Sequence, residues 1–140
     1  MQYSIPVKSI FSDASVFDPA LTETIQSSNL EGVAMELVRS TGIRPNLKGY
    51  MYLVKVVSRC AEDQELLFPL RAGAYKIVSL ECGVSVSCLE RNIRTAIDQA
   101  FFSTPDQLRR YFAYPGDKPY ASEFIAVLVD RLRQLYFVDL

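Results

Sequence analysis

The sequence of 140 residues contains no histidine and only three cysteines. Cys60, Cys82 and Cys88 form no CxxC pair, and a structural zinc site usually needs four cysteine or histidine ligands. We therefore expect no metal site and no cofactor. The missing histidine also removes histidine-based catalytic triads and general bases, so we expect that the protein is not an enzyme.

Long hydrophobic runs are missing as well. No apolar run approaches the ~18 residues that a membrane-spanning helix needs. The first residues, MQYSIPVKSIF, lack the basic start, the long apolar middle and the cleavage site of a signal peptide. We therefore expect a cytoplasmic protein without a membrane partner. Hydrophobic residues make up 49% of the chain, as in ordinary globular domains.

The sequence also lacks an excess of charge of either sign, since its formal net charge is -1. The charges are distributed unevenly: residues 1–32 have a net charge of −3, and residues 33–140 have a net charge of +2. We divide the chain accordingly into an acidic N-terminal arm, residues 1–32, and one domain, residues 33–140. A net charge of +2 attracts phosphates only weakly over long range, so any contact with nucleic acid must come from a local patch.

Helical patterns dominate the sequence after the arm. Apolar residues recur at helical spacing, and strand patterns are almost absent, which predicts an all-α domain of six helices. Within the arm we expect an edge strand over residues 1–10 and a short helix that begins at Asp18 and Pro19. Ser122 is the expected N-cap of the last helix. The six predicted helical segments are 30–42, 47–63, 68–82, 83–102, 105–114 and 122–137. In four of them we expect the following residues to face inward: Leu47, Tyr50, Met51, Val54, Val57 and Cys60 in the second, Leu70, Ala74, Ile77 and Val78 in the third, Val86, Leu89, Ile93, Ala96, Ile97, Ala100 and Phe101 in the fourth, and Phe124, Ile125, Leu128, Val129, Leu132 and Leu135 in the sixth.

Residues 79–102 have the pattern of a helix-turn-helix. Ser79 is the small residue that the first helix needs where the second helix crosses it, and Gly83 suits a turn with left-handed backbone angles. Leu89 and Ile93 are the apolar residues that would hold the second helix against the first. Ser85 is a natural N-cap, and Ser87 with Glu90 would form a capping box.

The other face of this second helix carries side chains that a DNA groove can use. Arginine pairs with guanine, glutamate accepts a hydrogen bond from cytosine, and serine or threonine contacts phosphates or bases. The pattern alone is equally compatible with the solvated face of an ordinary helix. The residues on this face are Ser87, Cys88, Glu90, Arg91, Arg94, Thr95 and Asp98.

From about Val33 to Tyr136 the sequence resembles the DNA-binding effector domains of the sporulation response regulator family, stage-zero sporulation protein A. The resemblance lies in the strings GIRPNLKGYMYL, CLERNIRTAI and YASEFIAVLVDRLR, which occur in the same order and at similar spacing. It implies a six-helix domain that binds a promoter box in double-stranded DNA, often as tandem copies or as a homodimer, and regulates transcription through RNA polymerase. By position it implies DNA contacts from Ser87, Glu90, Arg91, Arg94, Thr95 and Lys118.

The sequence departs from the family pattern at three points. Cys88, which we expect to be exposed, stands where the family has an arginine, so one cationic contact is lost. Thr95 stands where the family usually has a histidine. The regulator also has a phosphoacceptor receiver domain, and the arm is too short for one. We therefore expect no control by aspartyl phosphorylation.

Two functions remain open at this point. The protein is either a DNA-binding transcription regulator, or a protein-interaction module of the same fold that dimerises with or antagonises a full-length regulator. A further hypothesis is that the acidic arm folds back over the second helix and masks it, with Asp13, Asp18 and Glu23 imitating phosphates.

Overall fold

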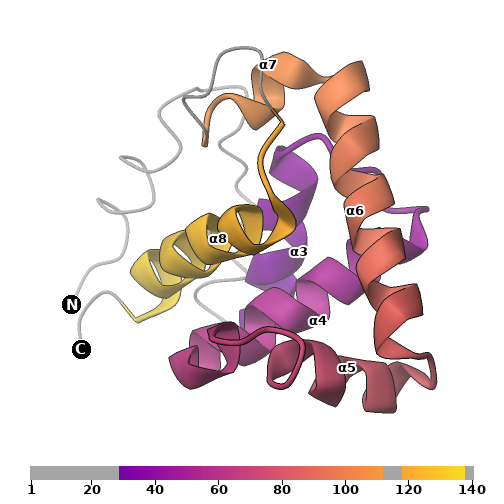
Figure 1. Ribbon diagram of the computed structural model, residues 1–140. Coiled ribbons are helices and arrows are strands. Elements are labelled where there is room, and N and C mark those ends of the chain that lie inside the picture. Colours follow the sequence, from indigo (N-terminus) through magenta and orange to yellow (C-terminus); the bar gives the residue numbers. More distant parts are fainter. Residues whose placement is uncertain (1–28, 112–117, 138–140) are drawn as a thin grey trace.

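The computed structural model describes residues 29–111 and 118–137. Within them the regular structure consists of six α-helices and one short 3-10 helix, with no strand, which confirms the all-α prediction. The strand and helix expected in the arm lie outside the described residues, so the division of the chain at residue 32 stays a prediction. The elements are α3 (Leu30–Ser40), α4 (Lys48–Glu62), η1 (Gln64–Leu67), α5 (Ala74–Cys82), α6 (Val86–Ser103), α7 (Pro105–Leu108) and α8 (Ala121–Tyr136) (Figure 1).

Helix α4 is the centre of the domain, because it packs against α3, α5, α6 and α8. The inward positions predicted at Tyr50, Val54, Val57 and Cys60 are buried, whereas Leu47 and Met51 are only partly buried. Two further residues, Leu53 and Val56, are fully buried although the sequence pattern did not indicate them. A single apolar stripe describes a helix that is covered on one side, and α4 is covered on several.

Gly49 lets α4 and α6 come into close contact. A Cβ atom at this position would lie 2.2 Å from the backbone oxygen of Asn92 and 2.8 Å from the Cβ atom of Ala96. No side chain larger than hydrogen fits there without moving one of the helices. Gly49 therefore helps to fix the position of α6, which runs along one side of the domain (Figure 1).

The helix predicted for residues 68–82 is shorter than expected, since α5 begins only at Ala74. The segment before it is a tight loop, in which the N–H of Gly73 donates to the backbone oxygens of Pro69 and Leu70. A Cβ atom on Gly73 would lie 2.6 Å from the backbone oxygen of Leu66. Leu70 is buried although it belongs to this loop and not to a helix. It lies four residues before Ala74, the spacing of neighbours on a helix face, and for this reason the predicted helix began too early.

The last two predicted helices differ from expectation at their ends. Helix α7 has a single turn, and a turn follows at residues 109–111, while residues 112–114 lie outside the described part. Helix α8 begins at Ala121 after Tyr120, so the predicted N-cap at Ser122 is wrong. Its apolar face is confirmed, because all six residues expected there are buried: Phe124, Ile125, Leu128, Val129, Leu132 and Leu135.

In the part of the chain that the structure describes, no helix has the length and hydrophobicity that crossing a membrane requires.

Candidate nucleic-acid interface

Helices α5 and α6 form the predicted helix-turn-helix. Gly83 ends α5 in the left-handed conformation, with φ 69° and ψ 33°, and the next N–H, that of Val84, donates to the backbone oxygen of Ser79 at 3.0 Å. Nothing lies within 4 Å of a Cβ atom built on Gly83. The turn therefore needs glycine for its backbone angle and not for space. Ser79 is buried, as predicted for the small residue of the first helix.

Helix α6 begins with a side-chain cap. The hydroxyl oxygen of Ser85 accepts a hydrogen bond from the N–H of Cys88 at 3.0 Å, which confirms Ser85 as the N-cap. The capping box predicted for Ser87 and Glu90 does not form, because Ser87 already lies in the first turn of α6. A cap of this kind satisfies one of the backbone donors that every helix leaves unpaired at its start.

One face of α6 is packed against the domain. The expected apolar residues are buried in its middle, and only those at its two ends, Val86 and Phe101, are partly buried. This packing fixes the rotation of α6 about its axis, so its opposite face points to solvent. The buried residues are Leu89, Ile93, Ala96, Ile97 and Ala100.

Four of the six predicted DNA-contacting residues are exposed on the outward face of α6: Ser87, Arg91, Arg94 and Thr95. Neither Arg91 nor Arg94 forms an ion pair with any residue that the structure describes. The two arginines are three positions apart, which makes them neighbours on a helix surface. The structure thus presents two adjacent guanidinium groups whose donors are available to phosphates or to guanine.

Glu90, the fifth predicted residue, is engaged within the molecule. Its side chain is only 23% exposed, and its Oε1 accepts a hydrogen bond from Nη1 of Arg71 in an ion pair. Arg71 belongs to the loop before α5 and was not predicted. The two residues are 19 positions apart in the sequence, and helical periodicity relates only residues within one helix.

Tyr75 lies beside the charged residues of α6. This side chain of α5 is buried, and burial raises its pKa from 10.0 to about 12. The negative charge of Glu90 contributes to this rise in pKa, and the positive charge of Arg94 opposes it. Glu90 and Arg94 therefore both act electrostatically on one phenol group at the contact between α5 and α6.

Lys118, the sixth predicted residue, is brought to α6 from the segment that precedes α8. Its Nζ lies 2.7 Å from Oδ1 of Asp98, and the two side chains are 40% and 33% exposed. Asp98 is one helical turn beyond Arg94, so Lys118 marks the far end of the outward face. In order to contact DNA, the Lys118 ammonium group would have to donate to a phosphate as well as to this carboxylate, or leave the carboxylate.

The cysteines differ in accessibility. Cys88 was expected to be exposed, but it is half-buried, and its sulfur accepts a hydrogen bond from Nδ2 of Asn92 at 3.4 Å. Burial raises the pKa of Cys60 from 9.0 to about 12, so this thiol stays protonated at neutral pH. Among the described residues, no three or more Cys, Asp or Glu side chains are grouped as a metal site would require.

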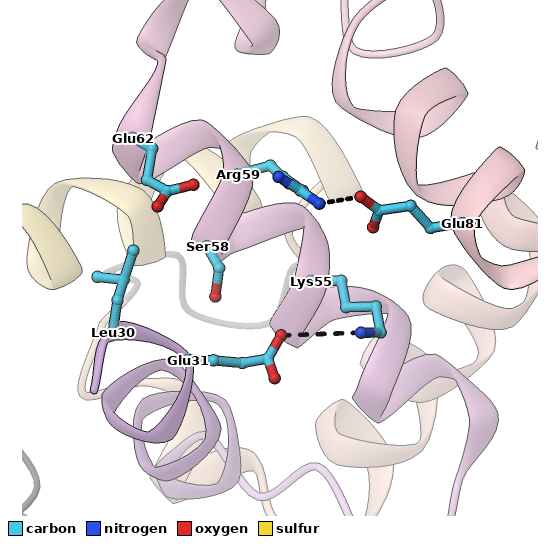
Figure 2. A pocket seen from close by; sticks show the side chains of 7 residues that line it. All are labelled: Leu30, Glu31, Lys55, Ser58, Arg59, Glu62 and Glu81. Atoms are coloured by element: carbon cyan, nitrogen blue, oxygen red, sulfur yellow. Dashed lines mark hydrogen bonds and ion pairs between the residues drawn. The ribbon is translucent and has the colours of Figure 1, made fainter.

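A polar pocket of about 330 Å³ lies between α3, α4 and α5, and none of the predicted DNA-contacting residues lines it. Figure 2 shows two ion pairs in its walls, one between Lys55 and Glu31 and one between Arg59 and Glu81. The hydroxyl of Ser58 is buried in the pocket wall and has no hydrogen-bond partner among the residues that the structure describes. Lys55 and Arg59 are thus neutralised within the molecule, whereas the arginines of α6 have no ion-pair partner among the described residues.

The chain matches a known protein family over most of its described length. The family described as "Sporulation initiation factor Spo0A C terminal" matches residues 34–132. The match includes the whole helix-turn-helix and most of α8. It confirms the resemblance that the sequence strings indicated over residues 33–136.

Proposed function

Because the chain belongs to the family of Spo0A C-terminal domains, which are DNA-binding effector domains of sporulation and not enzymes, we propose that it recognises a promoter box in double-stranded DNA through the outward face of α6. The single observation that carries this proposal is the pair Arg91 and Arg94. Both are exposed and neither has an ion-pair partner among the described residues.

The position of these side chains along α6 suits major-groove recognition. In helix-turn-helix proteins the second helix lies in the major groove, and residues near its N-terminus contact the base edges. Arg91 and Arg94 lie in the N-terminal half of α6, together with Ser87 and Glu90. We assign guanine or an adjacent phosphate to the arginines, and a cytosine N4 amino group to Glu90.

The remaining predicted residues would contact the DNA backbone. Ser87 and Thr95 carry hydroxyl groups at the two ends of the arginine pair and are exposed. Lys118 would reach a phosphate beyond the far end of the helix, where it now pairs with Asp98. Such contacts set the orientation of the protein on the duplex and carry no sequence information themselves.

The family resemblance supports three further parts of the proposal. The protein would regulate transcription through RNA polymerase, it would bind as tandem copies or as a homodimer, and it would act in the cytoplasm, where the promoters are.

The proposal is tested by the DNA affinity of two double variants that change the charge equally. Arg91→Ala/Arg94→Ala removes two cations from α6, and Lys55→Ala/Arg59→Ala removes two cations from the pocket. Fluorescence anisotropy with a labelled duplex that carries a promoter box of the family gives the dissociation constants at low salt. We expect the α6 variant to lose about 1–3 kcal/mol per arginine, and the pocket variant to bind nearly as well as the parent chain.

Equal, weak binding by the parent chain and both variants would refute recognition through α6. If the parent chain binds no duplex and instead copurifies with a full-length regulator, the protein-interaction module is the correct function. Circular dichroism of each variant shows whether its fold is intact.

A further inference from the structure

Arg71 is a cation at the edge of the outward face of α6, and the loop that carries it is well anchored. Tyr75 donates its N–H to the backbone oxygen of Leu70 at 2.8 Å, and Gly73 donates to the same oxygen at 3.2 Å. Leu70 itself is buried. These contacts join the backbone just before Arg71 to the backbone after it, so its side chain starts from a fixed position beside Glu90.

The ion pair leaves part of the Glu90 carboxylate available. Arg71 donates to Oε1, and no described residue donates a hydrogen bond to Oε2. A carboxylate accepts through both oxygens. The Glu90 side chain is 23% exposed and Arg71 is 59% exposed, so the pair lies at the surface with the glutamate on its inner side.

We propose that Arg71 is a positioning residue for base recognition: it holds the Glu90 carboxylate in one orientation, with Oε2 left to accept a hydrogen bond from a cytosine amino group. This inference rests on the proposed function of α6. It adds to the interface a residue from outside the helix-turn-helix, and it gives that residue a role in specificity rather than in general affinity.

The first physical reason concerns the conformational freedom of Glu90. A glutamate side chain has several rotatable bonds and can adopt many orientations. In addition, the phosphates of DNA repel a carboxylate that has no cationic partner. The guanidinium group of Arg71 offsets this charge and restricts the side chain before DNA arrives. Less entropy is then lost when the base contact forms.

The second reason concerns Arg94. A glutamate four residues before an arginine on a helix is placed to form an ion pair with it, and Glu90 and Arg94 have this spacing. In the structure Glu90 pairs with Arg71 instead. Arg71 thereby prevents Glu90 from forming an ion pair with Arg94, and the Arg94 guanidinium group remains available to DNA.

The rival role for Arg71 is a simple phosphate contact, which its exposure would also permit. The two roles differ in salt dependence. Each phosphate contact contributes about 0.9 to the slope of the logarithm of affinity against the logarithm of salt concentration. A residue that acts on a base through Glu90 leaves this slope unchanged and alters the preference for one base pair.

A double-mutant cycle with Arg71→Ala, Glu90→Ala and the double variant tests the inference. Dissociation constants are measured at several salt concentrations on the promoter box and on duplexes in which each base pair is replaced in turn. We expect Arg71→Ala and Glu90→Ala to lose about tenfold discrimination at the same single base pair. In the Glu90→Ala background, Arg71→Ala should have no further effect on that discrimination, and the salt slope should not change.

Two variants serve as controls. Arg59→Ala breaks another Arg–Glu ion pair, that with Glu81, and should leave discrimination unchanged. Arg71→Lys keeps the charge without the planar fork of the guanidinium group, and should restore discrimination in part.

The inference is overturned if the effects of Arg71→Ala and Glu90→Ala multiply, or if Arg71→Ala weakens binding to all duplexes uniformly and lowers the salt slope by about one. It is also overturned if Arg71→Ala has no effect. In these cases the parent chain still binds the box, so the proposed function stands. Failure of the parent chain to bind any duplex would refute both.

Discussion

The outward face of α6 and the polar pocket between α3, α4 and α5 are both rich in charge, but their cations have different partners. In the pocket, Lys55 and Arg59 pair with Glu31 and Glu81. On α6, Arg91 and Arg94 have no ion-pair partner among the described residues. Exposed ion pairs contribute little to stability, but they determine which cations already have an anionic partner and which are available to bind a phosphate.

This difference is the physical reason why a chain with a net charge of -1 could bear the DNA-binding surface that we propose on α6. Attraction to a phosphate depends mainly on charges within about 8 Å at physiological salt, because counterions screen the rest. The two arginines of α6 would act on a bound phosphate within this distance. The carboxylates of the pocket instead neutralise the pocket's own cations, Lys55 and Arg59. The local arrangement of charge is therefore more informative than the total.

Of the variants that distinguish the two regions, Gly49→Ala should have the largest effect on stability, because it disturbs the close contact that holds α6 against α4. Alanine normally stabilises a helix by about 1 kcal/mol relative to glycine. Here its Cβ atom would lie 2.2 Å from the backbone oxygen of Asn92, so we expect a loss of about 3 kcal/mol in the free energy of unfolding. Denaturant unfolding followed by circular dichroism measures it.

Gly83→Ala is the matched control for this variant. It meets no atom within 4 Å but would force alanine to φ 69°, so we expect a loss of only about 1 kcal/mol. A Gly49→Ala protein as stable as the parent chain would show that the contact between α4 and α6 is looser than the structure indicates.

Removing the helix cap in each region should have a second, smaller effect on stability, and the two cap variants should differ in DNA affinity. Ser85 caps α6, and Asn29 caps α3 by accepting from the N–H of Gly32 at 2.9 Å. Ser85→Ala and Asn29→Ala should each lower the free energy of unfolding by about 1 kcal/mol. Only Ser85→Ala should also weaken DNA binding, because it loosens the turn that carries Ser87 and Glu90.

Unfolding curves and anisotropy titrations of the two cap variants check this prediction. Equal losses of DNA affinity would mean that affinity follows overall stability and not the local order of α6.

The smallest effect concerns two buried serines, Ser58 in the pocket wall and Ser79 in α5, the first helix of the helix-turn-helix. The Ser58 hydroxyl in the pocket wall has no hydrogen-bond partner in the described part of the chain, and a buried polar group without a partner destabilises the folded state. Ser58→Ala should therefore leave the stability unchanged or raise it by up to about 1 kcal/mol. The Ser79 hydroxyl in α5 donates to the backbone oxygen of Lys76 at 2.8 Å, so Ser79→Ala should lower the stability by about 0.5–1 kcal/mol.

Thermal or chemical unfolding of both serine variants tests this expectation. A clear loss of stability in Ser58→Ala would mean that its hydroxyl is satisfied in solution, for example by water.

Much of the fold could be predicted because its signals are local. The turn requires a left-handed residue and the sequence provides Gly83, while Ser85 suits the start of a helix. The periodic apolar residues of α6 and α8 identified the buried faces, since each of these helices packs mainly on one side. Leu70 in the loop and Ala74 in α5 are four residues apart, which is also the spacing of neighbours on a helix face. The prediction therefore extended the helix through the loop and made α5 too long.

The sequence by itself determined the helical class, the helix-turn-helix and which side chains face outward on α6, because backbone angles, caps and periodicity involve residues a few positions apart. Only the tertiary structure decided which of those side chains already have partners. Arg71 reaches Glu90 and Lys118 reaches Asp98 from other segments, and Gly49 sets how closely α4 approaches α6. Such contacts depend on where distant elements meet in space, and the local pattern around each residue holds no information about that.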